Sequence, residues 1–126
     1  MKKQLLALAV LALAAGTASA QANDTLAKIK SSGTVNLGVR DSSGLAFTIG
    51  GGKYVGFHTE MAERIVDDLK KVTGNPNLKI NYQVITSQNR IPLVQNGTID
   101  YECGSPTNNT GHQTDAAFAA TKSAQE

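Results

Sequence analysis

The sequence predicts an α/β fold built on a largely parallel sheet. The first observation is an alternation of strand and helix patterns in the order 34–39, 59–72, 78–85, 90–95 and 98–103. A glycine-rich stretch at 50–53, flanked by apolar residues, adds a hairpin after the first strand. Polar residues gather where the strand patterns end. Alternating strands and helices are typical of parallel sheets, whose polar loops leave along one edge and bind small ligands there.

The first predicted elements are a short helix and a strand. Asp24 or Thr25 can cap a helix that runs to Lys30, and the Ser-Ser-Gly sequence at 31–33 ends it before the strand at 34–39. The hairpin around 50–53 follows. This order places a polar Arg-Asp-Ser-Ser segment at the carboxyl end of the first strand.

The segment 59–72 has the periodicity of an amphipathic helix that ends at Gly74. One face carries the apolar side chains Met61, Ala62, Ile65, Val66, Leu69 and Val72. The other face is charged and is expected to be solvated, with i,i+4 partners in Glu60 with Arg64 and Asp67 with Lys71. His58, just before it, is expected to be a surface residue at the helix start.

A strand, a short helix and a second strand follow. Ser87 is placed to cap the helix at 90–95, Pro92 is tolerated in its first turn, and Asn-Gly at 96–97 stops it. Because such units close right-handed, both strands are expected to run parallel. Their polar loops would then emerge on the same edge of the sheet.

The N-terminal segment has the pattern of a secretory signal peptide. Lys2 and Lys3 precede an apolar run at 5–15, and Ala18-Ser19-Ala20 is a small-x-small cleavage site, so we expect a signal peptide at 1–20 and a mature domain at 21–126. Export to the periplasm follows. Removing two of the twelve basic side chains leaves ten against ten acidic ones. A near-neutral mature chain offers no general attraction to nucleic acid or anionic membranes.

Known catalytic and metal-binding patterns are missing from the sequence. Residues 50–54 do not form a P-loop, and His58, Cys103 and His112 lack the spacing of metal ligands. Cys103 is the only cysteine, which excludes an internal disulfide, and it is expected to be a buried small hydrophobe at a strand end. We therefore expect no cofactor, no metal and no enzymatic activity.

The strand exits present guanidinium and hydroxyl groups that suit a small anion, namely Arg40, Ser42, Ser43, Thr86, Ser87, Arg90, Ser105 and Thr107 with the amide of Gly104. Arginine pairs a carboxylate through two parallel hydrogen bonds, and helix N-termini at the same edge add partial positive charge. The residues alone predict a small anionic ligand without saying which one.

The sequence TSQNRIPLVQNG at 86–97, followed by ECGS at 102–105, resembles the glutamate/aspartate group of the family-3 periplasmic solute-binding proteins. The resemblance runs from about Leu26 to about Phe118. It implies a type II periplasmic binding protein with two α/β lobes, of which this chain holds part of the first. It also implies capture of glutamate or aspartate for an ABC permease in the inner membrane. Positions matching Arg40, Ser87, Arg90, Ser105 and Thr107 contact the acidic amino acid in related proteins.

Two residues depart from the family pattern near the site. The resemblance implies an arginine for the ligand's α-carboxylate at the position of His112, in the loop after the third strand. A mostly neutral histidine offers one hydrogen-bond donor there, whereas the guanidinium of an arginine offers two parallel donors. Pro106 removes a backbone donor from the loop of Ser105 and Thr107. Binding by this chain is therefore expected to be impaired.

Two other functions remain open from the sequence. A non-functional truncated product is favoured by the missing second lobe and by the two departures. An enzyme on the same scaffold, as in dehydratases that resemble these binders, would need a cleft-facing acid or base. The nearby candidates are Asp41, Glu102 and His112.

Overall fold

The predicted α/β fold is present in the computed structural model of the chain, which describes residues 24–106 and 108–119. The expected signal peptide at 1–20 and the site residue Thr107 lie outside the described residues. Within them, the helices are too short or too polar to cross a membrane.

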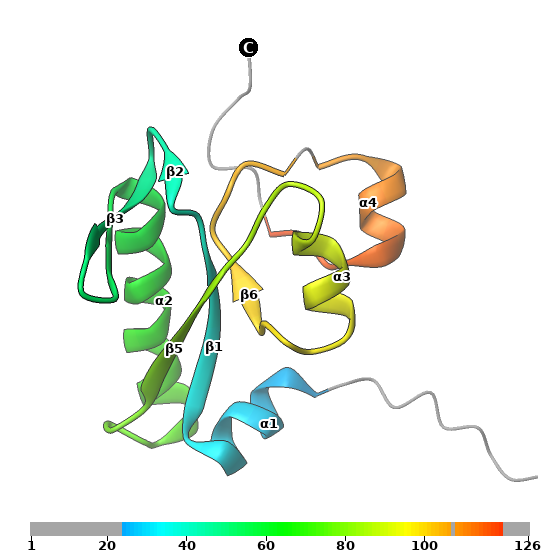
Figure 1. Cartoon of the computed structure of the whole chain (residues 1–126). Helices are drawn as coiled ribbons and strands as arrows, with labels where there is room; N and C mark the ends of the chain where they lie inside the picture. The colour runs from blue at the N-terminus through cyan, green and yellow to red at the C-terminus, as the bar shows by residue number, and fades with distance from the viewer. Residues whose placement is uncertain (1–23, 107, 120–126) are drawn as a thin grey trace, which may run out of the picture.

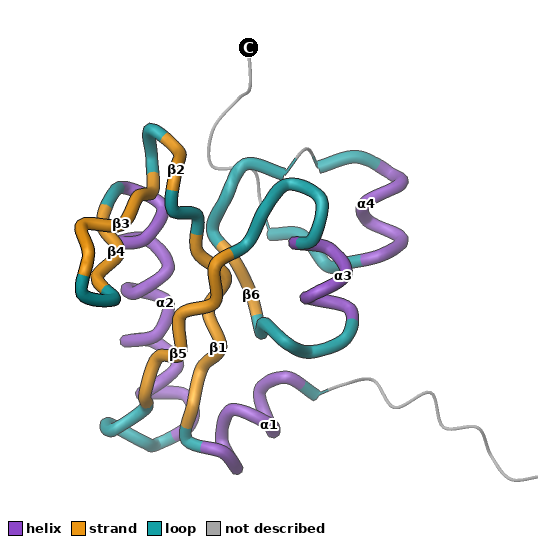
Figure 2. The backbone as a smooth tube through the Cα atoms, in the orientation of Figure 1, coloured by secondary structure: helices purple, strands orange, loops and turns teal. Residues whose placement is uncertain are grey.

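The strands of the described residues form two sheets. A parallel sheet has β1 (Thr34–Val39) at its centre, between β5 (Lys79–Val84) and β6 (Tyr101–Glu102), as Figure 2 shows. An antiparallel sheet contains β2 (Ser42–Ser43), β3 (Ala46–Gly50) and β4 (Lys53–Val55). The helices are α1 (Thr25–Ser32), α2 (Phe57–Thr73), α3 (Arg90–Gln95) and α4 (Thr110–Asp115), and Figure 1 shows α2 on one side of the parallel sheet and α3 and α4 on the other.

The register of the parallel sheet brings three strand exits together. β1 pairs with β5 from Thr34↔Lys79 to Val39↔Val84, and with β6 at Leu37↔Tyr101 and Gly38↔Glu102. All three strands run in the same direction, so their carboxyl ends meet at one edge. The prediction that β5 and β6 run parallel is confirmed, and both strands pair with β1 rather than with each other.

β6 is shorter than the predicted strand at 98–103. The backbone N–H of Ile99 donates to the carbonyl of Leu93 in α3 at 3.1 Å, so this part of the chain turns towards the helix. The next N–H, that of Asp100, donates to the carbonyl of Asn36 at 2.7 Å, and only then does regular pairing begin. Because of this hydrogen bond to α3, β6 begins at Tyr101 and not at residue 98.

Asp100 fixes the start of β6 against β1 and α1. Its side chain is 1% exposed and receives two strong hydrogen bonds, from Lys28 Nζ at 2.9 Å and from the backbone N–H of Asn36 at 2.7 Å. Lys28 Nζ also donates to the carbonyl of Gly97 at 2.7 Å. This cluster holds the two ends of the turn after α3 and sets the position of the β6 exit.

The buried stripe of α2 differs from the predicted one. Ala62 and Val66 are buried as expected, but Ile65 is 39% and Val72 is 64% exposed. Thr59 and Thr73 are buried instead, and their hydroxyls donate to the carbonyls four residues earlier, at 3.4 and 2.7 Å. These bonds satisfy the hydroxyls inside the helix. The three-stranded sheet covers only a narrow stripe of α2. Residues at the edges of the predicted apolar face, such as Ile65 and Val72, therefore stay exposed.

The start of α2 is locked to the hairpin through Gly56 and His58. Gly56 has φ of 113°, and a Cβ there would overlap the backbone of Leu45. The N–H of His58 donates to the carbonyl of Leu45 at 3.0 Å, and His58 is only 4% exposed. The expectation of a surface histidine is wrong, because the close approach of hairpin and helix covers its side chain.

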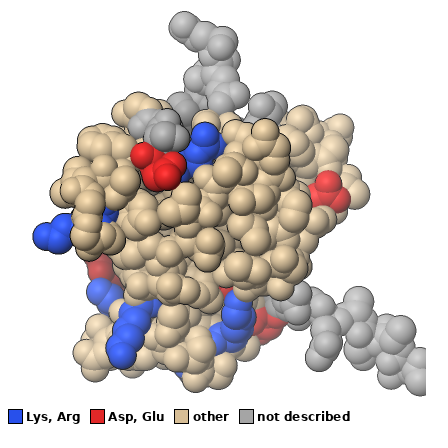
Figure 3. All heavy atoms as spheres, viewed as in Figure 1, with Lys and Arg blue, Asp and Glu red and all other residues tan. Residues whose placement is uncertain are grey.

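The outer face of α2 is charged, as predicted, but with different partners. Lys70 pairs with Asp67 at 3.0 Å and Lys71 with Asp68 at 3.4 Å, both at i,i+3 spacing. Such exposed pairs stabilise a fold by only about 0–1 kcal/mol. On the face shown in Figure 3, basic and acidic side chains are interspersed around the rim.

Two tyrosines join α2 to the parallel sheet. The hydroxyl of Tyr82 donates to Glu63 Oε1 at 2.6 Å, and that of Tyr101 donates to the carbonyl of Ala62 at 2.7 Å. Burial, reinforced by the hydrogen bond to Glu63, raises the pKa of Tyr82 to about 12. Burial also raises the pKa of Tyr101 above its usual value. Both shifts mean that the fold favours the neutral phenols.

We expect the chain to lose stability as the pH rises from about 10 to about 12. A phenol whose pKa is higher in the folded state stabilises the fold fully below the unfolded value of 10 and progressively less as the pH passes the folded value. Urea unfolding across this range measures the loss. Tyr82→Phe should make the slope shallower, whereas Tyr82→Phe with an unchanged slope would contradict this origin.

Candidate ligand-binding site

Three of the predicted site residues meet at the carboxyl edge of the parallel sheet. Arg40 directly follows β1, Ser87 follows β5, and Arg90 is the first residue of α3. Ser87 Oγ accepts a hydrogen bond from Arg40 Nη1 at 3.1 Å and another from Arg90 Nη2 at 3.2 Å. One hydroxyl thus bridges two guanidiniums that come from different strand exits.

Ser87 does not cap α3, contrary to the prediction. Thr86 and Asn89 close the preceding turn reciprocally, since the Thr86 N–H donates to Asn89 Oδ1 at 2.7 Å and the Asn89 N–H donates to Thr86 Oγ1 at 3.2 Å. This arrangement leaves the Ser87 hydroxyl to the arginines. The Ser87 hydroxyl therefore lies with the two arginines of the candidate site and does not cap the helix.

Arg90 forms a buried ion pair with Glu102, the last residue of β6. Arg90 Nη1 and Glu102 Oε1 lie 3.2 Å apart, and their side chains are only 6% and 9% exposed. Arg90 Nε is buried without a hydrogen-bond partner among the residues that the structure describes. Sequence reasoning identified Glu102 only as a candidate acid for an enzyme. The available signal was the position of this acidic residue near the end of the predicted strand at 98–103, in the same strand-helix-strand unit as Arg90.

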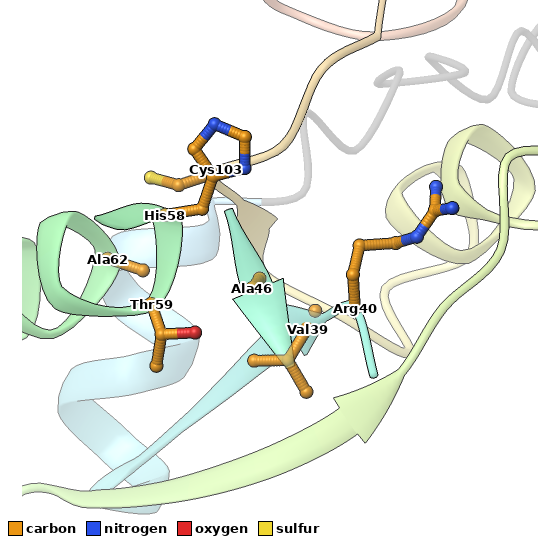
Figure 4. Close-up of a pocket in the computed structure, with 8 residues that line it drawn as sticks. Val39, Arg40, Ala46, His58, Thr59, Ala62 and Cys103 are labelled. Carbon is orange, nitrogen blue, oxygen red and sulfur yellow. The ribbon is translucent and has the colours of Figure 1, made fainter. Parts of the chain in front are cut away.

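Arg40 is the more accessible of the two arginines. It is half-buried, and across 24–106 and 108–119 it forms no ion pair, Asp41 included. Figure 4 shows its side chain extending away from Val39 and from the small cavity beside it. Arg40 is therefore not paired with its sequence neighbour Asp41 and remains a cation at the edge.

The remaining predicted site residues lie on the loop after β6 and beyond it. Ser105 is exposed, and Thr107 is outside the described residues. His112 lies in α4 rather than in a loop, is half-buried, and stacks on Phe118 with ring centroids 6.4 Å apart. Sequence reasoning missed α4, whose N-terminus is capped by Asn109 Oδ1 accepting from the His112 N–H at 2.9 Å. Figure 1 places α4 beside α3.

A small cavity lies between the hairpin, α2 and the exit of β6. Its lining, most of it labelled in Figure 4, consists of Gly38, Val39, Arg40, Ala46, His58, Thr59, Ala62 and Cys103. The cavity measures about 10 Å³, enough for about one water molecule and far below the ~300–1,000 Å³ of small-molecule pockets. An amino acid would therefore lie on the open edge, not inside this cavity.

The chemistry of the edge is that of anion binding. Two guanidiniums and one hydroxyl converge, and one of the guanidiniums is neutralised by Glu102. Charge-assisted hydrogen bonds from arginine to a carboxylate are roughly twice as strong as neutral ones. In the described part of the chain, His, Cys, Asp and Glu side chains form no group of three that could hold a metal ion. Cys103 directly follows β6 and packs against the cluster of Leu37, Val39 and Ala62, but it is half-buried rather than buried as expected.

Comparison with known proteins decides the family. Residues 35–125 match the bacterial extracellular solute-binding proteins, family 3. The chain belongs to this family. It is 43% identical over 120 residues to an L-glutamate/L-aspartate-binding protein of Pseudomonas aeruginosa, and 42% identical over 127 residues to a glutamate/aspartate import solute-binding protein of Escherichia coli. The predicted resemblance is confirmed.

This family-3 chain covers only part of its relatives. The two matches include 91% and 96% of the chain but 39% and 42% of the relatives' lengths. Among solved structures, an ancestral cationic amino acid solute-binding protein matches with a TM-score of 0.60 and 23% identity, over 71% of this chain and 37% of that one. An ancestral amino-acid-binding protein, a precursor of cyclohexadienyl dehydratase, matches with a TM-score of 0.50 and 25% identity, over 60% and 31%. The first likeness supports the fold alone.

Proposed function

We propose that this family-3 chain contributes to the binding of an acidic amino acid, glutamate or aspartate, for import by an ABC permease. The observation that carries the proposal is the Arg40–Ser87–Arg90 cluster at the carboxyl edge of the sheet. Two sequence relatives above 40% identity bear names that specify glutamate and aspartate. The cluster supplies the positive charge that such a ligand requires.

In the proposed complex, the side-chain carboxylate of the ligand lies against Arg40 and Ser87. Arg40 offers the accessible guanidinium, and Ser87 is held in place by hydrogen bonds from both arginines. Ser105 and Thr107 would supply hydroxyl groups from the loop after β6, and His112 would face the α-carboxylate with a single donor. Arg90 would act mainly through Ser87, because its side chain is 6% exposed and paired with Glu102.

Catalysis on this scaffold has little support in the arrangement of acids and bases. Glu102 is bound to Arg90 and 9% exposed, so it is a poor proton acceptor for a ligand. Asp41 is exposed beside the site. The match to a dehydratase precursor is to an amino-acid-binding protein, which fits the binding role.

We further propose that the protein is exported, with 1–20 as its signal peptide and 21–126 as part of the mature solute-binding lobe. The secreted product is expected to begin at Gln21, because Ala20 ends the small-x-small site. Intact-mass measurement of periplasmic protein checks this start. A product that still begins at Met1 and stays in the membrane would contradict it.

The proposed function is tested by ligand-observed NMR titrations of the full 126-residue chain with L-glutamate and L-glutamine. We expect glutamate to bind more tightly, since glutamine lacks the charge that pairs with Arg40. Arg40→Gln should weaken glutamate binding about tenfold or more while changing glutamine binding little. Lys53→Gln, which removes an exposed charge from the hairpin, is the matched control.

Two results would overturn the proposal. One is equal binding of glutamate and glutamine, and the other is glutamate binding that is indifferent to Arg40→Gln. No binding of either ligand would favour the alternative of a chain that does not function by itself.

A further inference from the structure

The net charge of the candidate site is set by a residue that lies behind it. Arg40 and Arg90 contribute two positive charges, and Glu102 removes one of them through the ion pair at 3.2 Å. Because both members of this pair are more than nine-tenths buried, solvent screens their interaction less than it would at the surface. The edge is therefore left with one uncompensated guanidinium, that of Arg40.

The Glu102 carboxylate fills the space beside Gly104. A Cβ on Gly104 would overlap this carboxylate, so a larger residue there would require the Glu102 side chain to move. The position of β6 is fixed in turn by Asp100, which binds Lys28 and the Asn36 N–H. Glu102 thus stays beside Arg90 as a built-in counter-charge rather than as a mobile surface acid.

Other acidic groups do not take over this role. Asp41 is exposed, where solvent and salt screen its charge, and Asp100 is already paired with Lys28. Glu63 binds the Tyr82 hydroxyl on the side of the sheet where α2 packs. Glu102 is therefore the carboxylate that decides how much positive charge Arg90 adds to the edge.

We propose that Glu102 is a specificity-determining residue that limits the site to singly charged side chains and disfavours doubly charged ones. The inference rests on the proposed function, because it concerns the same ligand. One net positive charge matches a single carboxylate. A dianionic side chain, such as a phosphate monoester, needs a second positive charge that Glu102 has neutralised.

The test uses two amino acids whose side-chain anions have similar tetrahedral shapes and different charges. L-Cysteate carries a sulfonate with one negative charge, and O-phospho-L-serine carries a phosphate that is mostly dianionic at about pH 8. NMR titration of the full chain gives a dissociation constant for each, and their ratio reports the preference for charge. In the unmodified protein, cysteate is expected to bind more tightly.

Glu102→Gln should shift this ratio about tenfold towards phosphoserine. The variant keeps an amide oxygen that can accept from Arg90 and removes only the charge. One unit of charge at a few ångströms, in a partly screened environment, has an effect of this order on a ligand that carries one extra charge. Glu102→Asp, which keeps the charge, should leave the ratio near its original value. Glu60→Gln, which removes an exposed charge from α2, is the control for net charge.

A double variant separates charge from structure. Arg90→Gln with Glu102→Gln removes both members of the pair and leaves the net charge of the edge unchanged, so the ratio should return to that of the unmodified protein. A merely structural role of Glu102 would not be restored in this way.

The outcomes distinguish this inference from the proposed function. If L-glutamate binds but Glu102→Gln leaves the ratio unchanged, the inference is wrong and the proposed function stands. If the unmodified chain binds phosphoserine as tightly as cysteate, the inference is wrong whether or not the variants fold. If neither glutamate nor cysteate binds, the proposed function fails and the inference fails with it.

Discussion

Arg90→Ala is expected to lower the free energy of unfolding by about 3–5 kcal/mol, because it leaves the Glu102 carboxylate buried without its partner. Small domains have a total stability of about 5–15 kcal/mol, so this variant would lose a large part of its stability and, if the unmodified chain lies at the lower limit, about half of its molecules would be unfolded at room temperature. Binding would fall with the folded fraction. Urea unfolding followed by circular dichroism measures the change in the free energy.

Two further variants show whether the buried pair is the cause. Arg64→Ala removes an exposed guanidinium from α2 and should change the stability by less than about 0.5 kcal/mol. Arg90→Met with Glu102→Leu replaces both charges by apolar groups and should recover most of the loss. A stable Arg90→Ala protein, or a double variant as unstable as the single one, would contradict this account.

Glutamate binding by the 126-residue polypeptide alone is expected to be millimolar or weaker. The resemblance implies a ligand clamped between two lobes, and the chain spans 39% and 42% of the lengths of its two relatives. Each missing charge-assisted hydrogen bond removes about 1.5–3 kcal/mol. Three missing bonds, including the one that an arginine in place of His112 would supply, lower a micromolar affinity of about −8 kcal/mol by roughly 5–9 kcal/mol.

Calorimetric titration with L-glutamate measures this affinity. His112→Arg should improve it, because a guanidinium restores a two-pronged donor where the neutral imidazole offers one. Gln113→Arg, which adds the same charge one residue further along α4, is the matched control. A dissociation constant in the low micromolar range for the unmodified polypeptide would show that the estimate is wrong.

The elements that depend on local patterns were predictable. β1 at Thr34–Val39 and α3 at Arg90–Gln95 have the predicted bounds, since turn residues and apolar periodicity mark both. β6 and the buried stripe of α2 differ from the prediction. Their limits depend on contacts between distant segments, such as the Ile99 N–H bonding to Leu93 and the narrow sheet beneath α2. Local periodicity contains no information about these contacts.

In the candidate site too, features that follow from local patterns were predictable, and those that depend on contacts between distant segments were not. Arg40, Ser87 and Arg90 could be grouped from sequence, because parallel strands bring their exits to one edge. The hydrogen-bond partners and burial of each residue could not be predicted from sequence. Whether Ser87 caps a helix or bridges two arginines depends on Thr86 and Asn89, and whether Arg90 faces a ligand or Glu102 depends on the register of β6 beside β1. His58 is buried for a similar reason, through the contact with Leu45.

The central claim is that the carboxyl edge of the parallel sheet binds an acidic amino acid. Protein-observed NMR titration of the isotope-labelled chain with L-glutamate tests it most directly, because each backbone amide reports on its own surroundings. We expect saturable shift changes concentrated at Arg40, Ser87 and Ser105, with the amides of Asp67 and Lys71 on the outer face of α2 unchanged. Shift changes that are absent from this edge, or that gather on the hairpin or on α2 instead, would contradict the claim.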